Sequence, residues 1–568
     1  MVALRIDPKS ETLETYLKID NGQLKIPFSQ RPYEWDKPEV ERLFDDLTSL
    51  YKSNNVHMLN FLTLSAENPH EVRIYDGQQR TITSILILAV FAHKLKEFDL
   101  LDQYGYTNRV YLKDENPLNR NVSSKRKLMF DDLSDQKLFY DLIDNGLTNI
   151  SEYNIRRSSQ KSFINNYTYI TNLLEEFIIE HNLKVDEIAD VLSTLLENTY
   201  LITIKTDHDG LARSMFESLN NTGKALDSYF VLKNDVVICL SESKVKDRWN
   251  SMDNYIQNYN PSNFLTAFAT ILDGKTTKAR ALESIYDNYD KENQSEMDEL
   301  LDIMVKASNY YHQILSPKEI NSNDASLTKE YIKLSESIAV FSVKQHYHLI
   351  LSMFMSKNDL KDINLVLGYI LNIAIRNFYF YEVKGNTIEV PLANLARDVY
   401  RKELAIEDII KQLEKLLVTD SDLIKIIEAK NINTPTQETR MKFILREIYQ
   451  KYDFNKEVQI KDSLKKIHYE HILPQNPKVK SQWRNDFIKD DLEKYTYKIG
   501  NGTLLLDKIN HSASNRDFSD KKELLVNSDI PENKTIAANS RWGKREINAR
   551  TVRIGNKIIE YLNSLIDK

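Results

Sequence analysis

The N-terminal part of the chain alternates short apolar runs with a longer helical stripe, a pattern typical of a mixed α/β unit. Residues 23–28 (QLKIPF) predict a strand, and the apolar positions of 37–51 recur at helical spacing. The apolar runs 58–64 and 71–76 flank the turn-forming stretch SAENPH and predict a hairpin. A long helix is expected to begin at Gly77, directly after the second of these strands, and residues 199–206 (TYLITIKT) predict a further strand.

The spacing of the apolar residues changes twice in the rest of the chain. From about residue 240 to about 460 the pattern is helical almost throughout, and the tyrosines and phenylalanines there are expected to pack between helices. The last hundred residues predict extended segments at 468–475 and 499–506, with a helix over 481–495 between them. A further helix is expected after the second extended segment, with Asn510 at its start. The expected class is α+β and predominantly helical. The expected domains are 1–240, a helical connecting region at 241–430, and 431–568.

Composition limits the compartment and the kind of partner. The net charge of −7 argues against a protein that coats nucleic acid over its whole surface, although it leaves room for a local basic groove. Cys239 is the only cysteine, so an internal disulfide and a multi-cysteine zinc site are excluded. The first twenty residues do not follow the pattern of a signal peptide, and no apolar run approaches the ~20 residues that span a bilayer. A cytoplasmic protein without a membrane partner is expected.

The stretch HYEHILPQNP (468–477) carries the first candidate chemistry. Neighbouring residues on a strand point to opposite faces, so Glu470 can ligate a cation while His471 faces a water. Asn510, thirty-nine positions beyond His471 in the printed sequence, offers a second oxygen ligand, and oxygen ligands suit Mg²⁺. Histidine suits proton abstraction near neutral pH. A structural zinc site that includes His468 and a plain packing cluster are the alternatives.

The second candidate chemistry lies at the start of the long N-terminal helix. Asp76 and Gly77 end a strand, and Arg80 falls in the first helical turn. A helix N-terminus offers free N–H groups, glycine lets the backbone approach an anion, and arginine binds phosphate with a planar fork. This pattern predicts a phosphate site, with a purely structural Asp–Arg pair as the alternative. A Gln-Arg pair follows a strand twice, at Gln30–Arg31 and within Gln78–Arg80.

The C-terminal residues also resemble a known motif. EHILPQ followed by IGNGTLLLDKIN resembles the HNH, or ββα-metal, nuclease motif. The resemblance implies that His471 is the general base and that Glu470 and Asn510 hold the metal. It implies further that Asn501 holds the loop and orients His471. Asn515 is expected to add a contact. Asn510 stands where many such enzymes have histidine, which favours a hard cation such as Mg²⁺.

The N-terminal residues resemble a second domain that accompanies this nuclease. IPFSQRPYEW, DGQQR and MFESLNNTGKALDSYF resemble the N-terminal domain of GmrSD-type restriction enzymes, which has a ParB/sulfiredoxin-like fold. The resemblance implies nucleotide binding and hydrolysis and the sensing of modified DNA. Asn220, in the third motif, is an additional candidate. The implied nucleotide-binding residues are Gln30, Arg31, Asp76, Gly77, Gln78, Gln79 and Arg80.

Together these patterns predict a Mg²⁺-dependent DNA endonuclease of anti-phage type that acts on modified DNA and is regulated by a nucleoside triphosphate (NTP). The basic run around Trp542 is the candidate DNA contact, and such runs are also common on solvated helices. An RNase and a non-catalytic, toxin-like regulator with a vestigial nuclease domain are the alternatives. The choice of NTP and self-association into a homo-oligomer stay open. The predicted DNA-binding residues are Arg541, Lys544, Arg545 and Arg550.

Overall fold

The structure is a computed structural model, and the chain forms two compact units. One unit comprises Met1–Leu265 with Lys278–Ser308, and the other comprises Thr266–Thr277 with Asn309–Lys568. The protein is mostly helical, with a mixed sheet in its N-terminal part, which confirms the predicted α+β class. The division into three domains stays a prediction. The structure describes residues 6–18, 23–53, 55–68, 70–114, 125–155, 157–220, 227–401, 404–452, 467–506 and 515–567.

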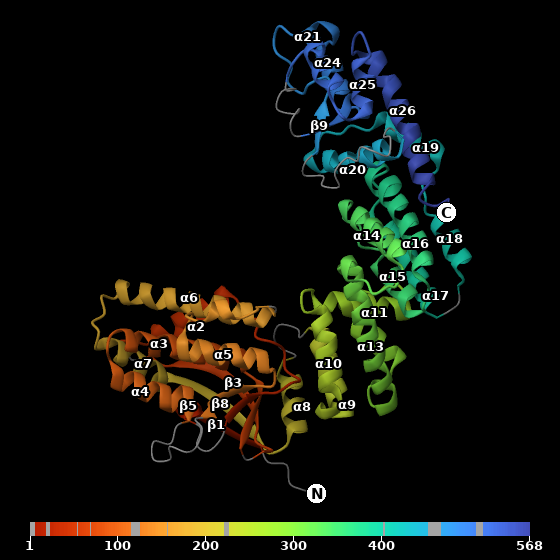
Figure 1. Ribbon diagram of the computed structural model, residues 1–568. Coiled ribbons are helices and arrows are strands. Elements are labelled where there is room, and N and C mark those ends of the chain that lie inside the picture. The colour runs from red at the N-terminus through yellow and green to blue at the C-terminus, as the bar shows by residue number, and fades with distance from the viewer. Residues whose placement is uncertain are drawn as a thin grey trace. The chain divides into compact units, whose positions relative to one another are not determined.

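A six-stranded mixed sheet organises the first unit, with the strand order β1-β8-β3-β4-β2-β7 (Figure 1). Strands β3 and β4 pair antiparallel, which confirms the predicted hairpin, whereas β3 with β8 and β2 with β4 pair parallel. Parallel neighbours require crossovers, and helices provide them here. The strands are β1 (Ile6–Thr12), β2 (Gln23–Ile26), β3 (His57–Ser65), β4 (Glu71–Asp76), β7 (Leu128–Phe130) and β8 (Thr199–Thr206).

The helix that follows β4 is the centre of this unit's core. Helix α3 (Gln78–Glu97) buries residues on all sides, because α5, α6 and α7 pack around it. This explains why its sequence is apolar almost throughout instead of showing one apolar stripe. The other helices of this layer are α1 (Leu13–Leu17), α2 (Lys37–Thr48), α4 (Leu101–Thr107), α5 (Leu133–Asn145), α6 (Ser158–Glu180) and α7 (Glu187–Asn198).

The chain then becomes helical. Helix α8 (Asp209–Asn220) lies against β3, β4 and β8, and α9 (Ser228–Leu240) packs on α10 (Glu242–Ile256) and α12 (Ala281–Asn288). Helices α11 (Pro261–Asp273) and α13 (Gln294–Leu315) follow the same pattern of buried apolar positions.

In the second unit, pairs of packed helices precede the C-terminal strands. Helix α14 packs on α16, and α15 packs on α17. Among the described residues, Leu360–Phe380 is the one helical stretch long and apolar enough to cross a membrane, and 89% of its most apolar window is buried inside the protein. That burial is typical of a core helix. The elements are α14 (Ala325–Val340), α15 (Tyr347–Met355), α16 (Leu360–Ile373), a π-helix (Ala374–Phe380), α17 (Gly385–Tyr400), α18 (Ile406–Glu414), α19 (Asp420–Ala429) and α20 (Pro435–Tyr452).

The C-terminal segment has the predicted order of strand, strand and helix. Strand β9 (Ile467–His471) pairs antiparallel with β10 (Gly502–Leu506), and helix α24 (Phe518–Val526) follows. The single helix predicted over 481–495 is two short helices instead, because the buried Phe487 adopts an extended backbone between them. The remaining helices are α21 (Gln482–Asp486), α22 (Lys489–Thr496), α25 (Pro531–Ala537) and α26 (Lys544–Asn563).

Candidate functional site

The pairing of β9 with β10 positions the two residues that sequence reasoning favoured most. In the register of the two strands, His471 lies opposite Gly502 and Glu470 lies opposite Thr503. A Cβ atom at Gly502 would lie 1.9 Å from the Tyr469 hydroxyl, so this close approach requires glycine. Because neighbouring side chains on a strand point to opposite faces, Glu470 and His471 have separate partners.

His471 is buried and has a polar partner at each ring nitrogen. Its Nδ1 lies 3.0 Å from the carbonyl oxygen of Thr496, and its Nε2 lies 3.3 Å from Oε1 of Glu438 on α20. A carbonyl oxygen only accepts, so Nδ1 carries the proton in this contact. The Glu438 carboxylate also only accepts, so Nε2 donates in the contact as it stands. Nε2 can take a proton from a water only after this contact opens and the nitrogen has given up its own proton. The rings of Tyr469 and Tyr497 meet the imidazole edge to face and fix its plane.

Asn501 is fully buried and serves as a clamp. Its Nδ2 donates to the carbonyl oxygens of Leu473 and Thr496, at 2.9 and 2.8 Å. Its Oδ1 accepts from the backbone N–H of Leu473 and from the indole N–H of Trp542. Asn501 therefore shares the Thr496 carbonyl with His471 and holds the segment that follows β9. This geometry suits the positioning role that the resemblance implies, and it leaves the Asn501 amide no free group for a substrate.

Glu470 forms a buried ion pair with Lys521 on α24. The Lys521 Nζ lies 2.5 Å from Glu470 Oε1 and donates to the His471 carbonyl oxygen at 2.7 Å. Burial lowers the pKa of Lys521, and the neighbouring Glu470 carboxylate opposes that shift. The ammonium is only 2% exposed, so Glu470 is its source of charge compensation in this part of the site.

The surroundings of Glu470 decide which metal ion this site could hold. A carboxylate oxygen is the donor that a hard cation prefers, so the chemistry of Glu470 fits Mg²⁺. The second predicted ligand, Asn510, lies outside the described residues. Within the described ranges, no three His, Cys, Asp or Glu side chains gather as a metal-binding group. The zinc alternative based on His468 therefore has no support among these residues, and Glu470 is the one described ligand of the prediction.

The basic run at the C-terminus divides into buried and exposed residues. Arg550 is 3% exposed and donates to Glu532, to the carbonyls of Gly500 and Gly502, and to the Tyr449 hydroxyl. The prediction that Arg550 contacts DNA is therefore wrong, because its guanidinium is used to join α26 to β10. Trp542 is likewise buried, so the run is not centred on an exposed aromatic ring.

The other predicted DNA-binding residues remain on the surface. The Arg541 side chain is 75% exposed, Arg545 is exposed, and Lys544 pairs with Asp491 on α22. Asn515 is exposed in the turn before α24. The Asn220 side chain, like Asn510, is outside the described part of the chain.

At the N-terminal site, Asp76 and Gly77 join β4 to α3 as predicted. Gly77 has a φ of 88°, and a Cβ atom there would lie 1.7 Å from Leu62 Cδ2, so only glycine fits. The Asp76 carboxylate accepts from the Gly77 N–H at 2.7 Å and pairs with Arg80 at 3.5 Å. Arg80 also donates to the Leu59 carbonyl oxygen. The charged groups predicted to bind phosphate thus have partners within the protein.

The two glutamines of the DGQQR stretch bind the loop of the other N-terminal motif. Gln78 Nε2 donates to the Arg31 carbonyl oxygen, and Gln79 Nε2 donates to that of Pro32, both at 3.0 Å. Gln79 Oε1 also accepts from the backbone N–H of Glu34. Both glutamines are buried. Their amides therefore shape the QRPYEW loop, and this contact between the two motifs explains their joint occurrence.

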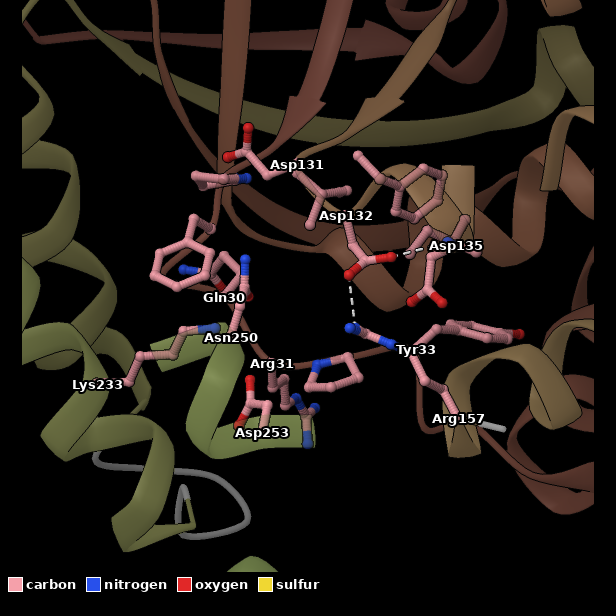
Figure 2. A pocket seen from close by; sticks show the side chains of 16 residues that line it. Gln30, Arg31, Tyr33, Asp131, Asp132, Asp135, Arg157, Lys233, Asn250 and Asp253 are labelled. Atoms are coloured by element: carbon pink, nitrogen blue, oxygen red, sulfur yellow. Dashed lines mark hydrogen bonds and ion pairs between the residues drawn. The ribbon is translucent and has the colours of Figure 1, made fainter. Parts of the chain in front are cut away.

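A small polar cavity lies beside this loop (Figure 2). It offers about 80 Å³ to the centres of water-sized molecules, which is room for several waters or a small polar ligand. Gln30 and Arg31 line it, whereas Asp76 and Arg80 are not among its lining residues. The other polar or charged lining residues are Tyr33, Asp131, Asp132, Asp135, Arg157, Lys233, Asn250 and Asp253.

The charge of this cavity comes from four carboxylates and three basic side chains. Asp132 pairs with Arg157 at 2.6 Å, and burial raises the pKa of Asp135 to about 6. Gln30 Nε2 and Asp135 Oδ1 are buried, and neither has a hydrogen-bond partner within the described residues. Figure 2 shows Lys233, Asn250 and Asp253 on the side opposite Asp131 and Asp135. Four carboxylates oppose a triphosphate inside the cavity, so its lining suits a neutral polar group.

Sequence reasoning missed two residues of the C-terminal site. Glu438 is distant in sequence and gave no signal. Lys521 did leave one, because Phe518, Lys521 and Leu525 share one face of α24 and all three are buried. A lysine at an apolar position of an amphipathic helix indicates a buried charge with a partner.

A strand–strand–helix segment with a buried, oriented histidine, joined to an α/β unit with interlocking Gln-Arg motifs, defines a two-part enzyme of the nuclease class. Family models support this. Residues 13–237 match the GmrSD restriction endonuclease N-terminal domain, and residues 418–557 match the C-terminal domain of GmrSD restriction endonucleases. The chain belongs to the GmrSD restriction endonuclease family. Comparison with curated proteins gives no match.

Proposed function

We propose that this protein is an anti-phage DNA endonuclease that hydrolyses phosphodiester bonds with His471 as general base. The observation that carries the proposal is the pair of contacts at the His471 ring. Nδ1 donates to the Thr496 carbonyl, so Nε2 is the ring nitrogen that can act as the base once its contact with the Glu438 carboxylate opens. A water that reaches Nε2 must come between it and Glu438, which is partly exposed at the start of α20.

The other residues of the site orient this base and neutralise charge. Asn501 holds the Thr496 carbonyl and the segment after β9, which fixes the imidazole. Glu470 and Asn510 would hold a divalent cation, Mg²⁺ in the simplest case, which offsets charge on the leaving oxygen when bound. Arg541, Lys544 and Arg545 would contact the DNA backbone, where they position the strand without reading its bases.

We propose further that the N-terminal unit binds and hydrolyses an NTP and directs the nuclease to modified phage DNA in the cytoplasm. The N-terminus of α3 supports phosphate binding there, because a helix N-terminus attracts anions. The carboxylate-rich cavity beside Gln30 and Arg31 supports a separate polar subsite, since a triphosphate would be repelled from it.

Cleavage assays with purified protein test this function. Modified phage DNA, unmodified phage DNA and RNA would each be incubated with Mg²⁺, with and without each NTP. The proposal predicts that DNA is cut, that an NTP changes the rate, and that His471→Ala abolishes cutting. His70→Ala, an exposed histidine in the first unit, is the matched control and is expected to cut as the wild type does.

The outcomes separate the alternatives. Cutting of RNA but of neither DNA would show that RNA is the substrate. NTP hydrolysis without cutting of any nucleic acid, together with a biological effect that survives His471→Ala, would contradict the endonuclease and favour the regulator.

A further inference from the structure

Lys521 is a buried cation on α24 that lies beside the end of β9, and the proposed hydrolysis does not use it. Its side chain is 2% exposed on α24, whereas the adjacent Lys522 is only partly buried and donates to the Asn539 carbonyl oxygen. A buried ammonium is costly unless it is paired and hydrogen-bonded. Both hydrogen bonds that the structure gives for Lys521 Nζ are to the end of β9. One acceptor is the Glu470 carboxylate and the other is the His471 carbonyl oxygen.

The position of this ammonium matters because Glu470 is the carboxylate proposed to hold the divalent cation. Lys521 Nζ donates a charge-assisted hydrogen bond to Glu470 Oε1, so the two groups are in direct contact. A metal ion ligated by that same oxygen would lie against a like charge in a poorly solvated place, where repulsion is strong. The ammonium and the metal therefore compete for Glu470.

We infer that Lys521 is the resident cation of this site: it balances Glu470 in the metal-free protein and must give up the Glu470 oxygen when a divalent cation binds. The inference rests on the proposed nuclease function, because that function assigns Glu470 to the metal. It makes Lys521 a positioning residue that sets metal affinity. Removal of its charge leaves the half-buried Glu470 carboxylate uncompensated, and such a carboxylate attracts a cation more strongly.

Binding of Mn²⁺ to the full chain, measured by titration calorimetry at constant pH, tests this inference without any nuclease readout. We expect Lys521→Met to bind Mn²⁺ tighter than the wild type by about tenfold or more. Lys521→Arg keeps a cation at Glu470 and should bind as weakly as the wild type. Lys522→Met is the matched control and should leave the affinity unchanged. Glu470→Gln should abolish binding in each background.

Thermal unfolding supplies the second readout. Lys521→Met should unfold at a lower temperature than the wild type without metal, and saturating Mn²⁺ should raise its unfolding temperature more than that of the wild type. If Lys521→Met fails to fold, Lys521→Gln, which keeps a polar end, replaces it in both experiments.

Two results would overturn the inference. One is an Mn²⁺ affinity of Lys521→Met, or of Lys521→Gln in its place, that is equal to or weaker than that of the wild type, which would show that Lys521 does not compete with the metal for Glu470. The other is Mn²⁺ binding that does not depend on Glu470. Failure of the nuclease function is distinguishable from both, because it leaves tight, Glu470-dependent binding of Mn²⁺ without DNA cleavage.

Discussion

The two units use the side-chain amides of their motifs in the same way but differ in what the amides enclose. In the first unit, Gln78 and Gln79 bind the backbone of the QRPYEW loop. In the second, Asn501 binds the backbone that follows β9. The first clamp stands beside a cavity lined by carboxylates, whereas the second fixes an imidazole with one basic nitrogen.

The comparison separates residues that hold the backbone in place from residues that can take part in chemistry. Gln79 and Asn501 are buried with both ends of the amide hydrogen-bonded, so they contribute to stability and orientation and have little left for a ligand. Gln78 Oε1 is buried without a partner among the described residues. The ionisable groups next to the clamps are the ones that can change protonation or hold a charged ligand. Substitutions should therefore have different signatures in the two classes of residue, and the predictions below depend on that distinction.

The largest effect is expected for His471→Ala. Loss of a general base lowers cleavage by about 10² to 10⁴-fold, with NTP hydrolysis unchanged. Single-turnover cleavage of labelled DNA and phosphate release from NTP would measure the two activities in parallel. A variant that still cuts at the wild-type rate would show that the second clamp, like the first, encloses no base.

The next effect is on stability, and it should appear in both units. Asn501→Ala leaves the buried Leu473 N–H and Trp542 indole N–H without their acceptor, at a cost of about 2–4 kcal/mol to the free energy of unfolding of the second unit. Gln79→Ala removes contacts to Pro32 and Glu34 and should cost the first unit about 1–3 kcal/mol. Calorimetric unfolding would resolve the two transitions. An Asn501→Ala protein with wild-type stability but no cleavage would give Asn501 a direct catalytic role.

Acid should act in opposite directions on two sets of buried groups, one set in each unit. Burial lowers the pKa of His346 to about 3 and that of His348 to about 4, so both are neutral in the folded second unit. Their unfolded pKa is about 6.5, so the unfolded state binds more protons as the pH falls, and each costs about 2 kcal/mol of stability between about pH 7 and about pH 5.

In the first unit, burial raises the pKa of Asp135 to about 6, so the folded state binds the proton first. The stabilisation that protonated Asp135 gives to the first unit is fully present below the unfolded pKa of about 3.9 and is lost as the pH rises through about 6. A change from about pH 7 to about pH 5 therefore adds about 1 kcal/mol to the free energy of unfolding of this unit. Calorimetry across this range, with Asp135→Asn and with a His346→Gln, His348→Gln double variant, tests the assignment. A variant whose unfolding transition keeps the pH dependence of the wild type would contradict it.

The smallest effect is expected from the exposed basic residues. Arg541→Ala and Arg545→Ala should each weaken DNA binding a few-fold and reduce the salt dependence of the affinity by about one ion. Arg550→Ala should behave differently, because Arg550 is buried and pairs with Glu532. It should destabilise the second unit by about 3–5 kcal/mol. Fluorescence anisotropy at several salt concentrations measures the first effect, and calorimetry measures the second.

Much of the fold could be predicted from the pattern of residues along each segment. Strand β8, the β3–β4 hairpin and the start of α3 at Gly77 follow from apolar alternation, a turn-forming stretch and a glycine at a left-handed position. The order of β9, β10 and helix was likewise predicted. The break at Phe487 was not, because a buried aromatic side chain overrode the helical period of its neighbours.

The sequence by itself determined the family, the two motif-bearing ends, and the residue types suited to base and metal chemistry. Tertiary structure decided which of those side chains have partners. Arg550 and Trp542 sit in a basic run yet are buried, and Glu438 and Lys521 reach the site from helices that no local pattern connects to β9. The physical reason is that sequence periodicity reports which face of an element is apolar. The partner of a buried charge depends on which other element packs there.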